Sequence, residues 1–84
     1  MTVTLFSKTA CGSCMAAEKW MKKKGIEYEK VLIDDDEKLQ KELQAAGHSQ
    51  MPVVRAERAG QKIMEFAGFS DERITQLSKL IHAS

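Results

Sequence analysis

Cysteine, proline and aromatic residues are scarce in this chain of 84 residues. It has two cysteines, one proline and 6% aromatic residues. Two cysteines are too few for the disulfide framework that holds small secreted proteins together. The hydrophobic share of 43% is that of a folded globule and excludes a disordered tail. Because two hydrophobic cores would not fit in so short a chain, we expect one domain over residues 1–84.

The chain also lacks an excess of charge and a long apolar run. Thirteen Lys and Arg against twelve Asp and Glu give a net charge of +1, whereas a protein that binds nucleic acid normally has a clear basic excess. No apolar stretch approaches the roughly 20 residues that cross a bilayer. Residues 1–6 have no basic segment followed by an apolar one, as a secretory signal would. We therefore expect no nucleic-acid partner, no membrane partner and a cytoplasmic location.

The spacing of apolar residues predicts four strands and three helices. The strands are expected at 2–6, 27–33, 53–55 and 62–66, and the helices at about 12–24, at 36–46 and from about residue 71 to the end. This β-α-β-α-β-β-α order predicts a right-handed crossover with the first two strands parallel, followed by an antiparallel hairpin. The expected fold class is α/β with a thioredoxin-like (glutaredoxin-type) architecture, in which helices cover both faces of a four-stranded mixed sheet.

Helical spacing also predicts which side chains face the core. We expect burial of Ala16, Ala17, Trp20, Met21, Leu39, Leu43, Ala46, Ile74, Leu77 and Ile81. The acidic run 34–37 supplies capping candidates for the start of the second helix, and the loop Gly68-Phe69-Ser70-Asp71 supplies them for the third. Gly25 is a natural end for the first helix.

Cys11 and Cys14 are the main candidates for reactive residues in this sequence. A disulfide between cysteines three residues apart closes too short a loop to restrict the unfolded chain much, so it would be a poor structural staple. The pair is either redox-active, half of a site for a soft metal, or incidental in an interaction domain. Its position at the end of a strand-to-helix loop favours redox chemistry.

At that position Cys11 is the expected nucleophile and Cys14 the resolving cysteine. The free N–H groups and the dipole at a helix start lower the pKa of a thiol there, so Cys11 is expected to ionise readily. Cys14 lies one turn deeper and would displace the partner from the mixed disulfide. Lys8 either adds positive potential beside Cys11 or is an ordinary solvated lysine.

The metal-binding alternative needs more ligands than the sequence offers. A structural zinc site takes four, and only His48 and His82 could join the two cysteines. Copper chaperones also carry C-x-x-C after a first strand, but their order is β-α-β-β-α-β and this chain is predicted to end in a helix. We therefore expect no metal site.

Pro52 directly precedes the third predicted strand. In this topology the start of that strand lies beside the start of the first helix and its cysteines. We predict a cis Met51–Pro52 bond, with the backbone of Met51 free to pair with an extended substrate segment. Met51 could also serve as soft packing beside the sulfurs.

Four segments together resemble the NrdH-redoxins, glutaredoxin-like members of the thioredoxin superfamily. They are Cys11-Gly12-Ser13-Cys14, Gly25-Ile26-Glu27-Tyr28, Gln50-Met51-Pro52-Val53-Val54 and Gly68-Phe69. The resemblance implies a monomeric dithiol-disulfide oxidoreductase whose one redox group is the Cys11–Cys14 disulfide. It also implies that class Ib ribonucleotide reductase, or another disulfide-bearing protein, is the acceptor and that thioredoxin reductase and NADPH recharge the redoxin.

We expect partner-binding roles for residues around the cysteine pair, namely Lys8, Gly12, Ser13, Met51, Pro52, Gly68 and Phe69. The chain departs from the family at Gly12-Ser13, where larger residues such as Val-Gln are usual, at Ala17, where threonine is common, and in segment 67–71, which lacks an Arg-Pro. A glutathione-dependent glutaredoxin is the alternative. Such proteins usually carry Gly-Gly-x-x-Asp before the last helix, and here Phe69 replaces the second glycine.

Overall fold

The computed structural model describes residues 1–82 and contains the predicted elements in the predicted order. The strands are β1 (Thr2–Ser7), β2 (Glu29–Leu32), β3 (Val53–Arg58) and β4 (Gln61–Ala67), and the helices are α1 (Gly12–Lys23), α2 (Glu37–Ala45) and α3 (Asp71–His82). Within the described residues, none of the helices has the length and apolar character needed to span a bilayer.

The strands form one mixed sheet in the order β2-β1-β3-β4. β1 pairs with β2 in parallel and with β3 antiparallel, and β3 pairs antiparallel with β4. The parallel pair and the closing hairpin are both as predicted. The turn of the hairpin has Ala59 and Gly60 at positive φ, 53° and 78°, as two-residue hairpin turns of type I′ require.

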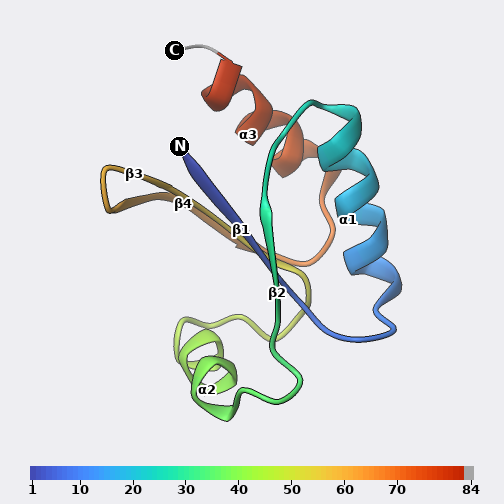
Figure 1. Ribbon diagram of the computed structural model, residues 1–84, viewed down its shortest axis with the longest axis vertical. Coiled ribbons are helices and arrows are strands. Elements are labelled where there is room, and N and C mark those ends of the chain that lie inside the picture. The colour runs from blue at the N-terminus through green and yellow to red at the C-terminus, as the bar shows by residue number, and fades with distance from the viewer. Residues whose placement is uncertain (83–84) are drawn as a thin grey trace.

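Successive residues of the inner strand β1 belong to two separate apolar clusters, and this determines which face of the sheet each helix covers. Leu5 packs with Ala17 and Met21 of α1 and with Ile74 and Leu77 of α3. Phe6, one residue on, packs with Ile33, Val53 and Leu43 of α2. Because successive side chains of a strand point to opposite faces, α1 and α3 cover one face of the sheet and α2 covers the other (Figure 1).

The helix ends follow ordinary capping chemistry, with one correction to the sequence-based expectations. Asp36 caps α2 by accepting a hydrogen bond from the backbone N–H of Leu39 at 3.0 Å. At α3 the cap comes from the predicted loop 68–71: the hydroxyl of Ser70 accepts from the N–H of Arg73, and Asp71 is the first residue of the helix. Ala46 is exposed, contrary to expectation, because α2 ends one residue before it.

Leu77→Ala is expected to lower the free energy of unfolding by about 2–5 kcal/mol, because it removes a fully buried side chain from the cluster between α3 and the sheet. Leu80→Ala is the matched control, since this leucine of the same helix is 42% exposed. Urea unfolding followed by Trp20 fluorescence measures both variants. Equal losses would contradict the assignment of the core face of α3.

Candidate active site

Cys11 and Cys14 form a disulfide at the junction between β1 and α1, with their Cα atoms 5.2 Å apart. Cys11 is the N-cap residue of α1 and Cys14 lies in the first turn. Their burial differs: Cys14 is 1% exposed, whereas Cys11 is partly exposed. Only the sulfur of Cys11 is therefore well placed to meet another protein.

The start of α1 provides donors for a negative charge on Cys11. The backbone N–H of Cys14 donates to Sγ of Cys11 at 3.3 Å, in the manner of an N-cap side chain. The first turn of α1 has no acidic residue to offset the positive end of the helix dipole. Both features favour the ionised form of the Cys11 thiol once the disulfide is reduced.

The loop before β3 meets the start of α1. The Met51–Pro52 bond is cis, as predicted from the sequence, and Pro52 is buried. The hydroxyl of Ser13 donates to the backbone carbonyl of Met51 at 2.8 Å. Residues 38 positions apart in the sequence thus lie in direct contact beside the disulfide.

Gly68 brings the segment before α3 to the same place. Its N–H donates to the carbonyl of Pro52 at 2.8 Å. Its φ is +82°, a backbone conformation that favours glycine, and a Cβ on it would have to displace the flexible side chain of Gln50. The next residue, Phe69, is 40% exposed. An exposed apolar residue therefore directly follows the one that bonds to Pro52.

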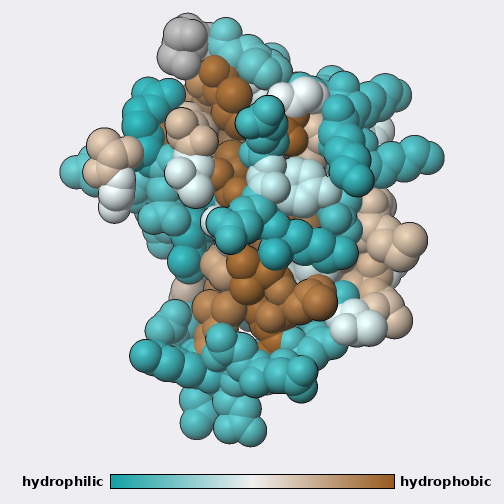
Figure 2. Space-filling view, in the orientation of Figure 1, coloured by the Kyte–Doolittle hydropathy of each residue, from teal (hydrophilic) through white to brown (hydrophobic). Residues whose placement is uncertain are grey.

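A cavity of about 390 Å³ borders the cysteine pair. It is lined by Lys8, Cys11, Cys14, Met15, Glu18, Lys30 and Leu32, together with Ser7, Thr9 and Ala10. Met15 and Leu32 are exposed large apolar residues at 67% and 54%. In Figure 2 an apolar area lies over the region where β2 approaches α2, with hydrophilic residues around it.

Glu18 is the main charged group of this cavity and was not singled out from the sequence. It accepts a hydrogen bond from Tyr28 at 2.9 Å and pairs with Lys30 at 3.2 Å. Burial alone would raise the pKa of Glu18, but the hydrogen bond from Tyr28 and the contact with Lys30 outweigh it and lower the pKa. Burial, with the bond to Glu18, raises the pKa of Tyr28 to about 12. Only the fold brings these three residues together, because Glu18 lies in α1, Tyr28 in the loop before β2 and Lys30 in β2.

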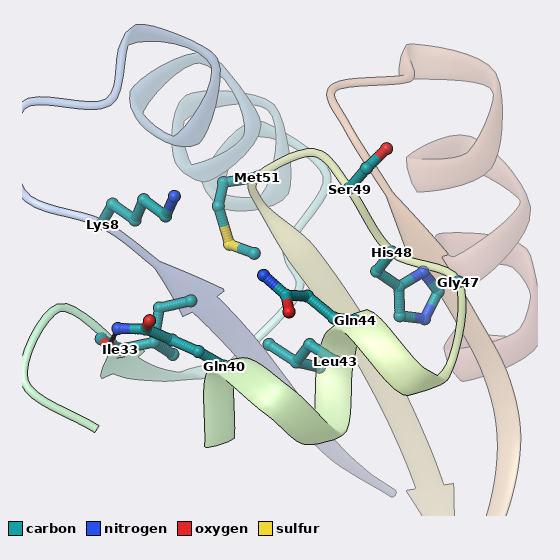
Figure 3. Close-up of a pocket in the computed structure, with 9 residues that line it drawn as sticks. All are labelled: Lys8, Ile33, Gln40, Leu43, Gln44, Gly47, His48, Ser49 and Met51. Atoms are coloured by element: carbon teal, nitrogen blue, oxygen red, sulfur yellow. Dashed lines mark hydrogen bonds between the residues drawn. The ribbon is translucent and has the colours of Figure 1, made fainter. Parts of the chain in front are cut away.

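A second cavity, of about 400 Å³, lies on the α2 side of Met51. Figure 3 shows Lys8 reaching toward it from the end of β1 and Met51 from the opposite side, with Gln44 and Leu43 of α2 below. Lys8 lines both this cavity and the one beside the cysteine pair. Lys8 is exposed, and its role as a source of positive potential at the site stays a prediction.

Asp34 holds the active-site loop and was assigned to helix capping from the sequence. Its carboxylate accepts from the backbone N–H of Thr9 at 3.0 Å and 3.3 Å. The hydrogen bonds from Thr9, with a smaller contribution from the charge of Lys8, lower the pKa of Asp34. No sequence signal could locate this contact, since the two residues are 25 positions apart.

The two histidines make other contacts. Nε2 of His48 lies 2.8 Å from Oε2 of Glu65, and Nδ1 of His82 lies 3.3 Å from the hydroxyl of Ser78. Within residues 1–82, no three His, Cys, Asp or Glu side chains are grouped so that they could hold a metal ion.

Comparisons with known proteins agree with this geometry. The glutaredoxin family model matches residues 3–59. The glutaredoxin-like protein NrdH of Salmonella typhimurium is 30% identical over 84 residues, covering all of this chain and 98% of that protein. The chain belongs to the glutaredoxin family, as an NrdH-redoxin.

Solved structures support the same assignment. The NrdH-redoxin of Escherichia coli, described as having a thioredoxin-like activity profile, is 27% identical and superposes with a TM-score of 0.80 over 92% of this chain and 95% of its own. A Schistosoma mansoni thioredoxin gives a TM-score of 0.69 over 94% of this chain and 76% of its own, at 25% identity. The predicted thioredoxin-like fold is confirmed.

This NrdH-redoxin is thus a small thiol-disulfide oxidoreductase that reduces disulfide-bearing partners, and its Cys-x-x-Cys pair is the redox-active disulfide. The pairing of Cys11 with Cys14, predicted from the resemblance, is present.

Proposed function

We propose that this redoxin carries electrons to protein disulfides, with Cys11 as nucleophile and Cys14 as resolving thiol. The proposed acceptor is a class Ib ribonucleotide reductase, and the proposed electron source is thioredoxin reductase with NADPH. We propose that it works as a single-domain monomer in the cytoplasm, where thiols are kept reduced. The contrast between a partly exposed Cys11 at a helix N-cap and a buried Cys14 carries the proposal.

The proposed cycle has two exchanges. The Cys11 thiolate attacks one sulfur of the partner disulfide, so one new S–S bond forms and the other partner sulfur leaves as a thiolate that takes up a proton. Cys14 then loses its proton and attacks Cys11, which releases the second partner thiol and forms the Cys11–Cys14 disulfide. The partner gains two electrons, and the redoxin loses them until a reductase dithiol restores them.

Docking of the partner is proposed to use the rim around Cys11. An extended segment would pair with the backbone of Met51 beside Pro52, while Gly12, Gly68 and Phe69 line its path. A Cβ on Gly12 would meet no atom within 4 Å, so the chain at this point leaves room for an approaching protein. Lys8 would add positive potential next to the reacting sulfur.

Phe69 supports a protein partner over glutathione. Glutathione-dependent glutaredoxins resemble this chain at Lys8 and Pro52 but usually have a second glycine where Phe69 stands. Phe69 is exposed and directly follows Gly68, and we propose that its ring stands in the path that a tripeptide would take.

Insulin reduction with two recycling systems tests the proposal. With thioredoxin reductase and NADPH we expect turnover at least about 10-fold faster than with glutathione, glutathione reductase and NADPH, because the site is proposed to accept extended protein segments. Escherichia coli glutaredoxin and thioredoxin are the two reference proteins. Faster turnover with glutathione would move the assignment to a glutathione-dependent glutaredoxin.

A further inference from the structure

The hydroxyl of Ser13 lies between the two groups on which the proposed reaction depends. Its Oγ is 2.8 Å from the carbonyl oxygen of Met51 and 3.4 Å from Sγ of Cys11. The first partner is the backbone group proposed to hold an extended substrate, and the second is the sulfur that reacts. One exposed side chain therefore contacts both the docking group and the reacting atom.

A serine hydroxyl has one proton, so it donates to one of these acceptors at a time. In the disulfide form Cys11 carries no proton and no charge, and a neutral sulfur is a weak acceptor. The amide carbonyl of Met51 is a strong one. The shorter of the two distances is accordingly the one to Met51, whose carbonyl is occupied in the oxidised protein.

Reduction changes the balance between the two acceptors. An external dithiol supplies two electrons and two protons. The Cys11–Cys14 bond breaks, one proton goes to Cys14, and the other goes to solvent when Cys11 remains as a thiolate. A charged acceptor attracts a hydroxyl donor more strongly than a neutral carbonyl does. Since Oγ of Ser13 is already within 3.4 Å of the sulfur, the O–H bond can turn to Cys11 with little movement of the chain.

We propose that Ser13 is a redox-linked positioning residue, whose hydroxyl donates to Met51 in the oxidised protein and to the Cys11 thiolate in the reduced protein. The exchange stabilises the thiolate and removes the Ser13 hydroxyl from one of the two lone pairs of the Met51 carbonyl, which makes this carbonyl a better acceptor for a substrate N–H just when Cys11 can react. After electron transfer the hydroxyl returns to Met51 and competes with the product for this carbonyl. The inference rests on the proposed docking of an extended segment at Met51.

Two measurements on the protein without any partner test the exchange directly. The first is the thiol pKa of Cys11, from thiolate absorbance during a pH titration. Ser13→Ala should raise this pKa by about one pH unit, because a hydrogen bond to a charged group is lost. Ser13→Thr keeps a hydroxyl and should restore the wild-type pKa. The charged side chains that line the adjacent cavity, Lys8, Glu18 and Lys30, are unchanged in both variants.

The second measurement is the ¹³C chemical shift of the Met51 carbonyl in oxidised and reduced protein. We expect a redox-dependent change in wild type and in Ser13→Thr, and a much smaller change in Ser13→Ala. Ser78→Ala is the control for a general loss of a serine hydroxyl, because Ser78 bonds to the carbonyl of Lys24 and to His82. It should leave the pKa of Cys11 and the Met51 signal as in wild type.

Binding of a non-reactive chain tests the consequence for docking. Carboxymethylated insulin B chain, titrated by NMR, should bind reduced wild type about 3- to 10-fold more tightly than oxidised wild type, the value of one hydrogen bond. In Ser13→Ala the two forms should bind equally. An unchanged pKa in Ser13→Ala, or a Met51 shift that does not respond to reduction in wild type, overturns the proposal. If wild type instead fails to reduce insulin with any reductase, the proposed function is wrong. The pKa of Cys11 and the chemical shift of Met51 need no partner, so they still show whether the Ser13 hydroxyl changes its acceptor.

Discussion

Cys11→Ser is expected to abolish disulfide reduction, with insulin turnover falling to the level of the assay blank. A serine hydroxyl stays protonated at neutral pH, so the N-cap position no longer holds an anion that can attack a disulfide. The replacement differs from wild type by one atom on a partly exposed side chain, so the fold should persist. Turnover with thioredoxin reductase and NADPH measures the loss, and circular dichroism checks the fold.

Cys14→Ser is the matched variant, and it should fail at the second exchange and not at the first. Cys11 would still attack insulin, but no thiol would remain to release the product, so a mixed disulfide should accumulate. Mass spectrometry would detect an adduct of the redoxin with one insulin chain, which dithiothreitol should reverse. An adduct formed by Cys11→Ser in place of Cys14→Ser would mean that the roles of the two cysteines are exchanged.

The fold could be predicted because apolar periodicity marked both faces of the sheet. Leu5 and Phe6 lie next to each other in a short alternating run and enter opposite clusters, which requires helices on both sides. Glycines with positive φ ended elements where expected, as Gly25 does after α1 with a φ of +71°. The error at Ala46 is a shift of one residue at the end of α2, and helix ends are the least certain part of such a prediction.

The centre of the site could be predicted for a different reason, namely that its parts carry local signals. The C-x-x-C spacing identifies Cys11 and Cys14 as a candidate redox pair, and Pro52 is the one proline of the chain. The supporting contacts have no such signal. The bonds from Ser13 to Met51 and from Thr9 to Asp34 join residues 38 and 25 positions apart, and either partner taken alone is an ordinary loop or helix-end residue. Their partners are set by the approach of loops, which the sequence pattern does not encode.

Glu65 is another such residue, and its contacts fix the loop that leads to Met51. It lies on β4 with its side chain 6% exposed. It contacts Nε2 of His48, the guanidinium of Arg55 and the ammonium of Lys62. His48 lies in the loop between α2 and β3, so one carboxylate links this loop to both strands of the hairpin. Burial acts to raise the pKa of Glu65, but the hydrogen bonds from His48 and Arg55 and the charge of Arg55 outweigh it and hold the pKa at about 2.

Stability is therefore expected to fall in acid as Glu65 takes up a proton. The pKa of this carboxyl is about 2 in the folded protein, against an ordinary value of 4.5. A lowered folded-state pKa gives stability that is fully present above the unfolded-state value and is lost as the pH falls toward the folded-state value. The loss should thus occur between about pH 4.5 and pH 2 and reach roughly 3 kcal/mol.

Glu65→Gln removes this contribution and should lower the free energy of unfolding at pH 7 by about 2–3 kcal/mol, with a flatter dependence on pH below 4.5. Urea unfolding between pH 2.5 and pH 7, followed by Trp20 fluorescence, measures both effects. Glu29→Gln makes the same change at an exposed position of β2, which lies at the opposite edge of the sheet from β4, and should retain the acid dependence of wild type. Because Glu65→Gln removes the carboxylate that contacts His48, this variant should also loosen the loop before Pro52 and weaken insulin reduction at pH 7, where the protein is still folded. Identical acid profiles for Glu65→Gln and wild type would show that other carboxylates control the acid stability of this redoxin.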